Sequence, residues 1–572
     1  MGDFPLSPDN AAPFNRTDVP HMKWWGWGVD GVSFSYANMP AFAPFIKKVV
    51  GLDLETRVAG QAPSFDDLEV PPSRIDDDLV KALTEVAGAD NVLTTAHERV
   101  LHTFGKSVRD LMRMRAGDFG RVPDVVVYPG SEAEVAAVVT MAAQRDFVVI
   151  PFGGGSNISG SLEPQAAEER VVVSLDMGRL HRLLDIDTDS GLARVEAGVR
   201  GPDLEAQLAE TGWTLGHFPD SFTHSTLGGW VATRSSGMQS DKYGDIADIT
   251  KGLRVARPDG ILALRPLPST STGPSLREMI LGSEGRLGVI TEVTIQVHRK
   301  PEAREVRAYL FKTWEHGVAA MRAITQNGLP VTLTRVSDAV ETSFSFATSK
   351  GSSGVEAMVK NGLMKYLKAK GWDLENIALS FVGYEGSSRQ IGAIRKAVGR
   401  IVKANEGISI GTGPGALYDQ KKFDTPYIRD FLLDRGSAAD VSETAAPWSK
   451  LVTMHDEVVK AAHAALRQAG VQGAIMSHLS HSYRSGACLY FTFAFVEDGN
   501  PTIEKYDVVK RAIQQTFIEV GGTPSHHHAI GVEHAPWLED VLSPSGYGVV
   551  AGLLESADPG RHLNPGKIVT TK

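Results

Sequence analysis

Short apolar runs alternate with helical stretches through the first half of the chain. Val125–Val127 and Val148–Ile150 are short enough to be buried strands, and the apolar positions of Glu132–Arg145 recur at helical spacing. Val171–Leu175 and Val289–Val297 predict two further strands. This alternation is typical of a domain in which helices pack against a sheet.

The composition and the apolar pattern of the sequence divide the chain into four segments. Residues 1–116 are rich in Pro, Gly and Trp and indicate an N-terminal wrapping segment, with a helix expected from Asp76 to Val86. The alternating pattern covers 117–300, and a second domain of mixed helices and strands is expected over 301–525. Residues 526–572 are expected to return to the first domain.

The second domain has its own pattern. Helices are predicted at Thr313–Gln326 and Trp448–Gln468, and strands at Ile377–Tyr384 and Ala487–Phe495. The Gly- and Ser-rich piece Ser349–Gly354 predicts an exposed loop.

Composition restricts the function classes. The net charge of −10 over 572 residues gives no general attraction to nucleic acid, so an anionic ligand must meet a few local arginines. A single cysteine, Cys488, excludes an intrachain disulfide and a cysteine-rich metal site. The first twenty residues lack the apolar run of a signal peptide, and no stretch approaches the ~20 apolar residues of a membrane span. A soluble, cytoplasmic protein is therefore expected.

Glycine-rich segments supply the first candidate chemistry. Residues 151–157 (Pro-Phe-Gly-Gly-Gly-Ser-Asn) follow a predicted strand, where N–H groups without neighbouring Cβ atoms can point at a pyrophosphate. One such loop is more often a tight turn than a ligand site. Three more such blocks lie at 220–226, 233–236 and 284–290. Four separate loops with no ligand to bind are the less economical interpretation.

Together and in this order, the four blocks resemble the FAD domain of vanillyl-alcohol oxidase and its relatives, over about 122–297. The resemblance implies an α+β fold, with a vanillyl-alcohol-oxidase/PCMH-type FAD-binding domain and an α+β cap domain for substrate. Because the first loop contains neither His nor Cys, we expect non-covalent FAD. The implied FAD contacts are Pro151, Phe152, Gly153, Gly154, Gly155, Ser156, Asn157, Asp220, Ser221, Phe222, Thr223, His224, Ser225, Thr226, Thr233, Arg234, Ser235, Ser236, Glu284, Gly285, Arg286, Leu287, Gly288, Val289 and Ile290.

Three consecutive histidines, His526, His527 and His528, follow Gly521-Gly522. A metal site is the obvious alternative explanation. Adjacent side chains in a loop seldom all reach one ion, and no Asp or Glu joins them at helical ligand spacing, so no metal is expected.

Most of the chain resembles the alkyl-dihydroxyacetonephosphate synthase family of ether-lipid synthesis. The similarity is carried by the four FAD blocks and by further motifs at Trp24–Gly28, Phe119–Asp124, Tyr427–Asp430, Glu443–Trp448, Tyr483–Cys488 and the triple histidine. It implies exchange of the acyl group of acyl-dihydroxyacetone phosphate for a long-chain fatty alcohol through a flavin N5 adduct, with no net redox change.

The resemblance also assigns roles. Tyr483, the three histidines and Arg335 match the family's catalytic positions, and Arg429 matches a substrate-binding arginine. Histidine suits a base because its pKa lies near neutrality. Taken alone, Arg429 beside Asp430 indicates a surface ion pair, and Tyr483 a core tyrosine.

Two other functions stay open at this point: an FAD-dependent D-2-hydroxyacid dehydrogenase or oxidase, and a non-catalytic flavin- or lipid-binding protein. Peripheral membrane contact through Trp24, Phe34, Phe42 and Phe45 is also open, with core packing as its alternative. A homodimer is neither indicated nor excluded.

Overall fold

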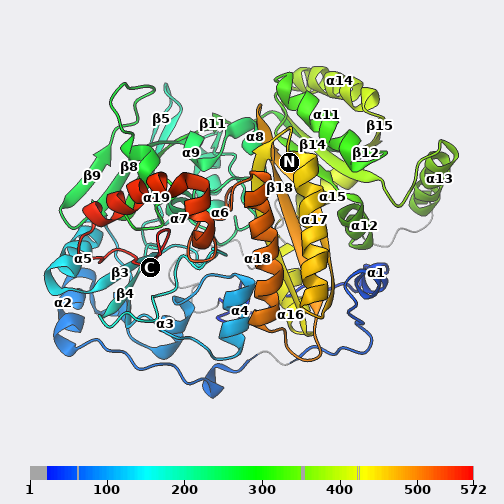
Figure 1. The fold of residues 1–572 in the computed structure, drawn as a ribbon. Coiled ribbons are helices and arrows are strands. Elements are labelled where there is room, and N and C mark those ends of the chain that lie inside the picture. The colour runs from blue at the N-terminus through cyan, green and yellow to red at the C-terminus, as the bar shows by residue number, and fades with distance from the viewer. Residues whose placement is uncertain (1–21, 61–62, 350–354, 422, 424, 571–572) are drawn as a thin grey trace.

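The structure, a computed structural model, describes residues 22–60, 63–349, 355–421, 423 and 425–570. Figure 1 shows two packed parts, one built on two small sheets and the other on a single large sheet. The loop expected at Ser349–Gly354 falls almost entirely outside the described residues.

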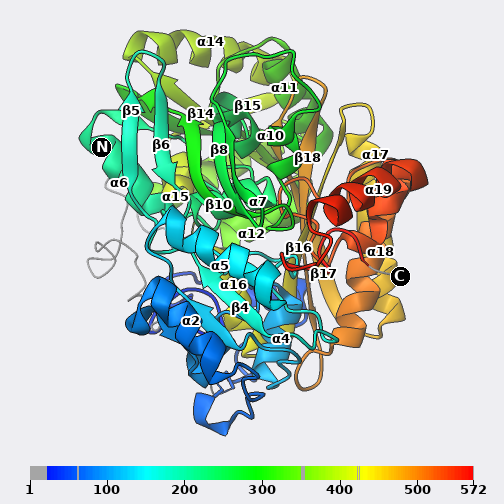
Figure 2. The same ribbon diagram turned by 90° about the vertical axis from the view of Figure 1, so that its left-hand side faces the viewer.

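The first small sheet is the predicted alternation of strands and helix. Its strands are β1 (Val92–Leu93), β2 (Val125–Val127), β3 (Val148–Phe152) and β4 (Val172–Asp176), in the order β1-β2-β4-β3. Strands β2, β4 and β3 are parallel, and α5 (Glu132–Arg145) has the predicted bounds. Figure 2 shows α5 and α2 (Asp77–Ala87) on the outside of this part.

The second small sheet is antiparallel and has the order β5-β6-β10-β8-β9. Its strands are β5 (Leu183–Asp187), β6 (Leu192–Glu196), β8 (Thr250–Arg257), β9 (Gly260–Leu264) and β10 (Val289–Gln296). The helices around it are α6 (Gly201–Glu210), α7 (Leu227–Thr233), α8 (Ser240–Tyr243), α9 (Ile246–Ile249) and α10 (Leu276–Ile280), and a short pair of strands, β7 (Trp213–Thr214) and β11 (His298–Arg299), lies nearby.

The large sheet has seven strands in the order β15-β12-β14-β13-β17-β18-β16, and all of its pairs are antiparallel. They are β12 (Ala303–Phe311), β13 (Leu333–Ser337), β14 (Ala378–Gly386), β15 (Gly407–Gly411), β16 (Ser437–Pro447), β17 (Gln472–Ser482) and β18 (Gly486–Val496).

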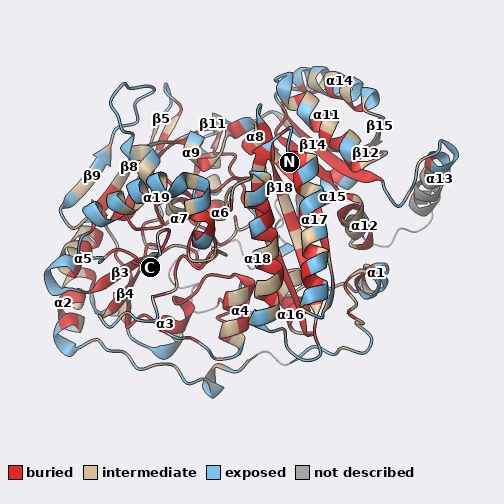
Figure 3. Cartoon of the chain, viewed as in Figure 1, coloured by how far each residue is buried: buried red, intermediate tan, exposed pale blue. Residues whose placement is uncertain are grey.

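The two faces of the large sheet meet different surroundings, as the alternating side chains of β12 show. Tyr309 and Phe311 pack into the core beneath α11 (Trp314–Gln326), α14 (Ser388–Ala404), α17 (Leu451–Gln468) and α18 (Ile503–Val520). Ala308 and Leu310 point to the opposite face, as the period of two requires. That face is the one that meets the cavity described below. Figure 3 shows the central strands of the large sheet mostly buried and the outer faces of the helices exposed.

The predicted start of α17 at Trp448 is wrong by three residues, because Trp448 is held outside the helix. Its backbone N–H donates to Ser485 O at 3.1 Å and its indole N–H to Tyr483 O at 3.0 Å. These two bonds fix the turn that carries Tyr483.

The N-terminal segment packs against the rest of the chain. Trp24 and Phe42 are buried, and Phe34 lies 5.2 Å from Phe431 between ring centroids. The packing interpretation is thus confirmed for Trp24 and Phe42. Among the helices of the described residues, none combines the length and apolar character needed to cross a membrane.

The C-terminal segment runs past the large sheet and ends on the first small sheet. After the histidines come α19 (Leu538–Ala557) and a stretch in which Asn564 N donates to Val149 O at 2.9 Å. Asn564 Nδ2 also donates to the backbone oxygens of Ser161 and Glu284. The sequence-based boundaries at 116, 300 and 525 stay predictions.

Candidate active site

One cavity of about 1220 Å³ lies between the small sheets and the large sheet. It is lined on one side by the glycine-rich blocks and on the other by strands β12 to β18, α12 (Ala339–Ala347) and α16 (Thr425–Leu433). A cavity of this size accommodates a large cofactor together with a substrate.

The loop at 153–155 requires glycine for a steric reason. A Cβ atom on Gly154 would lie 1.8 Å from His224 O, and one on Gly153 would lie 2.3 Å from Thr226 Oγ1. Gly155 has φ +61°, which favours glycine. Within the described part of the chain, the backbone N–H groups of 153–157 have no protein acceptor, so they are free to bind an anion.

Most of the residues with an implied FAD contact line this cavity. They are Pro151, Phe152, Gly153, Gly154, Gly155, Ser156, Asn157, Asp220, Ser221, Ser225, Thr226, Thr233, Ser235, Ser236, Glu284, Gly285, Gly288, Val289 and Ile290. Four sequence blocks that are far apart in the chain thus form one surface.

The remaining predicted contacts, Phe222, Thr223, His224, Arg234, Arg286 and Leu287, lie outside the cavity wall. The exposed Arg234 side chain forms an ion pair with Glu278 at 2.9 Å, so a flavin contact from its guanidinium does not fit its position. Phe222 is buried against Phe218 and Trp230. Burial lowers the pKa of His224 to about 3, which keeps this imidazole neutral.

A first prediction concerns the cofactor linkage. We expect acid precipitation to release all the flavin as FAD, because the loop that contacts the cofactor carries no His or Cys side chain. The absorbance of the supernatant and the in-gel fluorescence of the denatured chain measure this. Flavin that stays on the polypeptide would contradict the prediction. His217 and His224, which lie near the second glycine-rich block, would then be the candidates for a covalent link.

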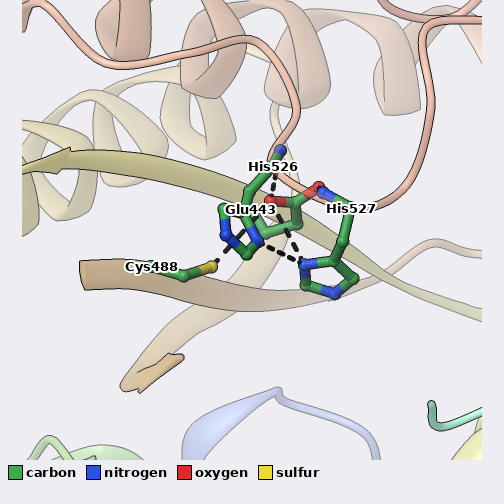
Figure 4. Close-up of side chains that lie close together, drawn as sticks. All are labelled: Glu443, Cys488, His526 and His527. Carbon is green, nitrogen blue, oxygen red and sulfur yellow. Dashed lines mark hydrogen bonds and ion pairs between the residues drawn. The ribbon is translucent and has the colours of Figure 1, made fainter. Parts of the chain in front are cut away.

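The triple histidine folds around one buried carboxylate, Glu443 of β16, which Figure 4 shows with His526 and His527. Backbone N–H groups of His526, His527 and His528 donate to Glu443 at 2.7, 3.0 and 3.1 Å, and Ser525 Oγ donates at 2.9 Å. Burial alone would raise the pKa of Glu443, but the three histidines and these N–H groups hold it well below its usual range. Glu443 is therefore the anion that shapes the loop.

The side chains of the loop continue into a chain of hydrogen bonds. Tyr483 O–H donates to Asp245 Oδ2 at 2.6 Å, and its oxygen lies 2.6 Å from His526 Nε2. His526 Nδ1 in turn lies 2.9 Å from His527 Nδ1. His527 and His528 line the cavity, whereas Tyr483 and His526 lie behind its wall. The structure thus brings the predicted tyrosine and histidines together in a row.

Glu443, Cys488, His526 and His527 could also hold a metal, since one potential ligand atom from each lies within 4.8 Å of the others. Both Glu443 oxygens already accept hydrogen bonds from the loop backbone, and both nitrogens of His526 have partners. Because these oxygen and nitrogen atoms already have hydrogen-bond partners in the protein, the arrangement favours a hydrogen-bonded network over a metal centre.

Arg335 lines the cavity from β13 and is held by Glu341. Its Nη2 atom lies 3.2 Å from His478 Nδ1, and its guanidinium lies 5.4 Å from the ring of Tyr418. Although burial would raise the pKa of Glu341, His478 and Arg335 lower it to about 2. Arg335 is therefore a fixed positive charge in the cavity wall.

Arg429 lines the cavity from α16. The interpretation as an ion pair with Asp430 is wrong, because Asp430 accepts the Trp27 N–H at 2.7 Å and lies within 4.0 Å of Lys23 and Arg115. Among the described residues, the buried Arg429 Nε atom has no hydrogen-bond partner. Arg429 therefore brings a positive charge to the cavity wall.

Three residues of this site received no role from the sequence. Glu443 is part of the motif Glu443–Trp448, and His481 lies two residues before Tyr483. Nothing in the sequence pattern assigned a role to either residue. His481 lines the cavity at a β-bulge with φ +47°. Asp245 precedes α9 and gave no sequence signal at all.

Comparison with known proteins agrees with this geometry. Residues 123–264 match the family described as FAD binding domain, and 300–568 match FAD linked oxidases, C-terminal domain. An alkyldihydroxyacetonephosphate synthase of Dictyostelium discoideum is 36% identical over 572 residues, covering 96% of this chain and 94% of the relative. The chain belongs to the alkyldihydroxyacetonephosphate synthase family. Its cofactor is FAD.

Solved structures place this family member in the expected fold. A structure of an alkyldihydroxyacetonephosphate synthase aligns with a TM-score of 0.83 at 35% identity, covering 96% of this chain and 99% of that one. p-Cresol methylhydroxylase, at 15% identity, aligns with a TM-score of 0.65 over 88% of this chain and 99% of the other. The predicted α+β, PCMH-type fold is confirmed.

Proposed function

We propose that this protein exchanges the acyl group of acyl-dihydroxyacetone phosphate for a long-chain fatty alcohol. The ester C–O bond to the dihydroxyacetone carbon breaks, the fatty acid leaves as a carboxylate, and the alcohol oxygen bonds to the same carbon. The alcohol proton passes to the protein, and because one C–O bond replaces another on the same carbon, the reaction has no net redox change. The family membership and the site geometry support this proposal.

The observation that carries it is the meeting of three features in one cavity: the FAD loops, the Arg429 side chain and the histidine loop. Arg429 would bind the substrate phosphate, since guanidinium pairs well with phosphate oxygens. Bound FAD supplies a conjugated ring that accepts an electron pair from the substrate carbon.

In this proposal, His527 takes the proton beside the substrate ketone. It lines the cavity, and its Nδ1 atom lies 3.7 Å from Glu443 Oε2. Tyr483 acts behind it, because the row of hydrogen bonds connects the phenol to His527 through His526.

Apolar side chains offer a place for the fatty chains. Phe45, Ile46 and Val49 of α1 (Phe42–Val49) line the cavity together with Phe344 of α12 and Leu432 of α16. Burying one CH₂ group contributes about 0.8 kcal/mol, so a long chain binds firmly against such a wall. The chain length that fits best stays open.

Anaerobic mixing separates this function from that of a hydroxyacid dehydrogenase. We expect acyl-dihydroxyacetone phosphate with a long-chain alcohol to yield an ether while the flavin ends oxidised. D-lactate and glycolate should leave the flavin absorbance unchanged. Lasting two-electron bleaching by either hydroxyacid, without ether formation, would establish the dehydrogenase instead.

A second prediction tests the phosphate contact. Arg429→Leu should raise the KM for the phosphate-bearing substrate about 10- to 100-fold, because a charged bidentate contact contributes about 1.5–3 kcal/mol. The FAD content should not change. Arg467→Leu, at an exposed position of α17, removes the same charge away from the cavity and is the control. An unaltered KM in Arg429→Leu would return this arginine to a structural role.

A cytoplasmic location stays a prediction from the sequence, and peripheral membrane contact and a homodimer stay open. Fractionation, vesicle flotation and sedimentation would test the three.

A further inference from the structure

A second, half-buried carboxylate touches the row of side chains that ends at His527. Asp245 Oδ2 accepts the Tyr483 O–H at 2.6 Å, at the end of the row opposite to His527. Burial and the nearby Asp245 raise the pKa of Tyr483, so the phenol keeps its hydrogen and donates it to Asp245. Asp245 is therefore the acceptor at this end of the row.

The neighbouring Asp241 does not share this role. It accepts the Ser482 N–H at 2.8 Å and the Thr334 hydroxyl at 2.5 Å. Burial raises the pKa of Asp241 to about 7. Among the carboxylates of the described residues near Tyr483, Asp245 is the one hydrogen-bonded to the phenol.

An acceptor at one end fixes the direction of every bond in the row. A phenol has one hydrogen, and Tyr483 uses it on Asp245, so its oxygen accepts from His526 Nε2–H. In the neutral His526 ring, Nδ1 is then an acceptor, and His527 Nδ1–H must donate to it. The remaining lone pair of neutral His527 is on Nε2.

We infer that Asp245 is a positioning residue that acts through Tyr483 and His526 to keep the His527 Nε2 lone pair free as the base. This inference rests on the proposed function, which needs a base in the cavity. If every bond in the row pointed the other way, the His527 proton would be on Nε2 and its lone pair on Nδ1. That lone pair would face His526. The proton acceptor would then be lost although every side chain remained in place.

Asp245→Asn tests the direction of the row, because the amide can donate to the phenol where the carboxylate could only accept. We expect turnover to fall by roughly 10²-fold, as when a histidine loses the partner that fixes its tautomer. The KM and the FAD content should not change. Asp248→Asn is the control, because Asp248 is exposed and lies three residues further on. The Asp245 N–H donates to the Asp248 carboxylate, and the amide oxygen of the substituted side chain can still accept this bond.

A double variant separates this role from a merely structural one. If Asp245 acts through the phenol, the Asn substitution should cost little more in a Tyr483→Phe background. A penalty of the same size in both backgrounds, or full activity of Asp245→Asn, would overturn the inference.

His526→Gln gives an independent test that does not depend on the folding of an Asp245 variant. Glutamine places an amide N–H near the position of Nε2 and keeps the donor to Tyr483, but it does not titrate. We expect His526→Gln to retain at least about a tenth of the turnover, whereas His526→Leu should lose about 10²-fold or more. Equal losses in both variants would assign the base to His526 and overturn the inference.

The failure of this inference differs from failure of the proposed function. A wild-type protein that makes no ether refutes the proposed function. An active wild type with fully active Asp245→Asn leaves that function intact and refutes the role of Asp245 alone.

Discussion

His527→Ala is expected to lower ether-forming turnover by about 10²–10⁴-fold, the usual contribution of a positioned general base. The variant should stay folded and yellow, because the Glu443 carboxylate is bound by backbone N–H groups that alanine retains. Exchange of the substrate's α-hydrogen with solvent deuterium should fall in parallel, since that proton is removed before the fatty acid leaves. Product formation and exchange are both measured by mass spectrometry.

His526→Ala and His528→Ala complete the series. His528 lines the same cavity, and burial and the neighbouring His527 lower its pKa well below the ordinary value. A metal role predicts another pattern: a chelator would abolish the wild-type activity and added zinc would restore it. If all three alanine variants form ether at the wild-type rate without metal, the proposed mechanism is wrong and the loop is structural.

Tyr483→Phe is expected to suppress ether formation to a similar degree, about 10²-fold or more. The substitution keeps the ring packing but removes the hydroxyl that joins Asp245 to His526. Burial and Asp245 both raise the pKa of Tyr483, so the phenol stays protonated over the working range of the enzyme.

Tyr490→Phe is the matched control for Tyr483→Phe. Tyr490 lines the same cavity and stacks near His527, with ring centroids 6.1 Å apart, but the row of hydrogen bonds does not pass through it. We expect the Tyr490 variant to keep turnover within a few-fold of wild type. Equal activities of the two variants would remove the hydroxyl of Tyr483 from the mechanism.

The elements that the sequence predicted best are those whose pattern reflects burial. Helix α5 has its predicted bounds because apolar spacing and the Ser131 cap both specify it. Trp448 was wrongly placed in α17 because its partners, Tyr483 and Ser485, are distant in sequence. No local pattern could show such a contact.

The same distinction holds for the site. The glycine loops and the triple histidine were visible because unusual residues cluster in the sequence. Glu443 and Asp245 were not, because each acts through partners more than eighty or two hundred residues away, as in the Glu443 bond to His526 and the Asp245 bond to Tyr483. Only the fold shows that one carboxylate shapes the histidine loop and the other contacts the phenol.

The origin of the ether oxygen tests the central claim most directly. Incubation of the holoenzyme with acyl-dihydroxyacetone phosphate and a long-chain alcohol labelled with heavy oxygen should give an ether that carries the label, one fatty acid per ether and a flavin that ends oxidised. An unlabelled product, or no ether while D-lactate or glycolate lastingly reduces the flavin, would contradict the proposed transfer.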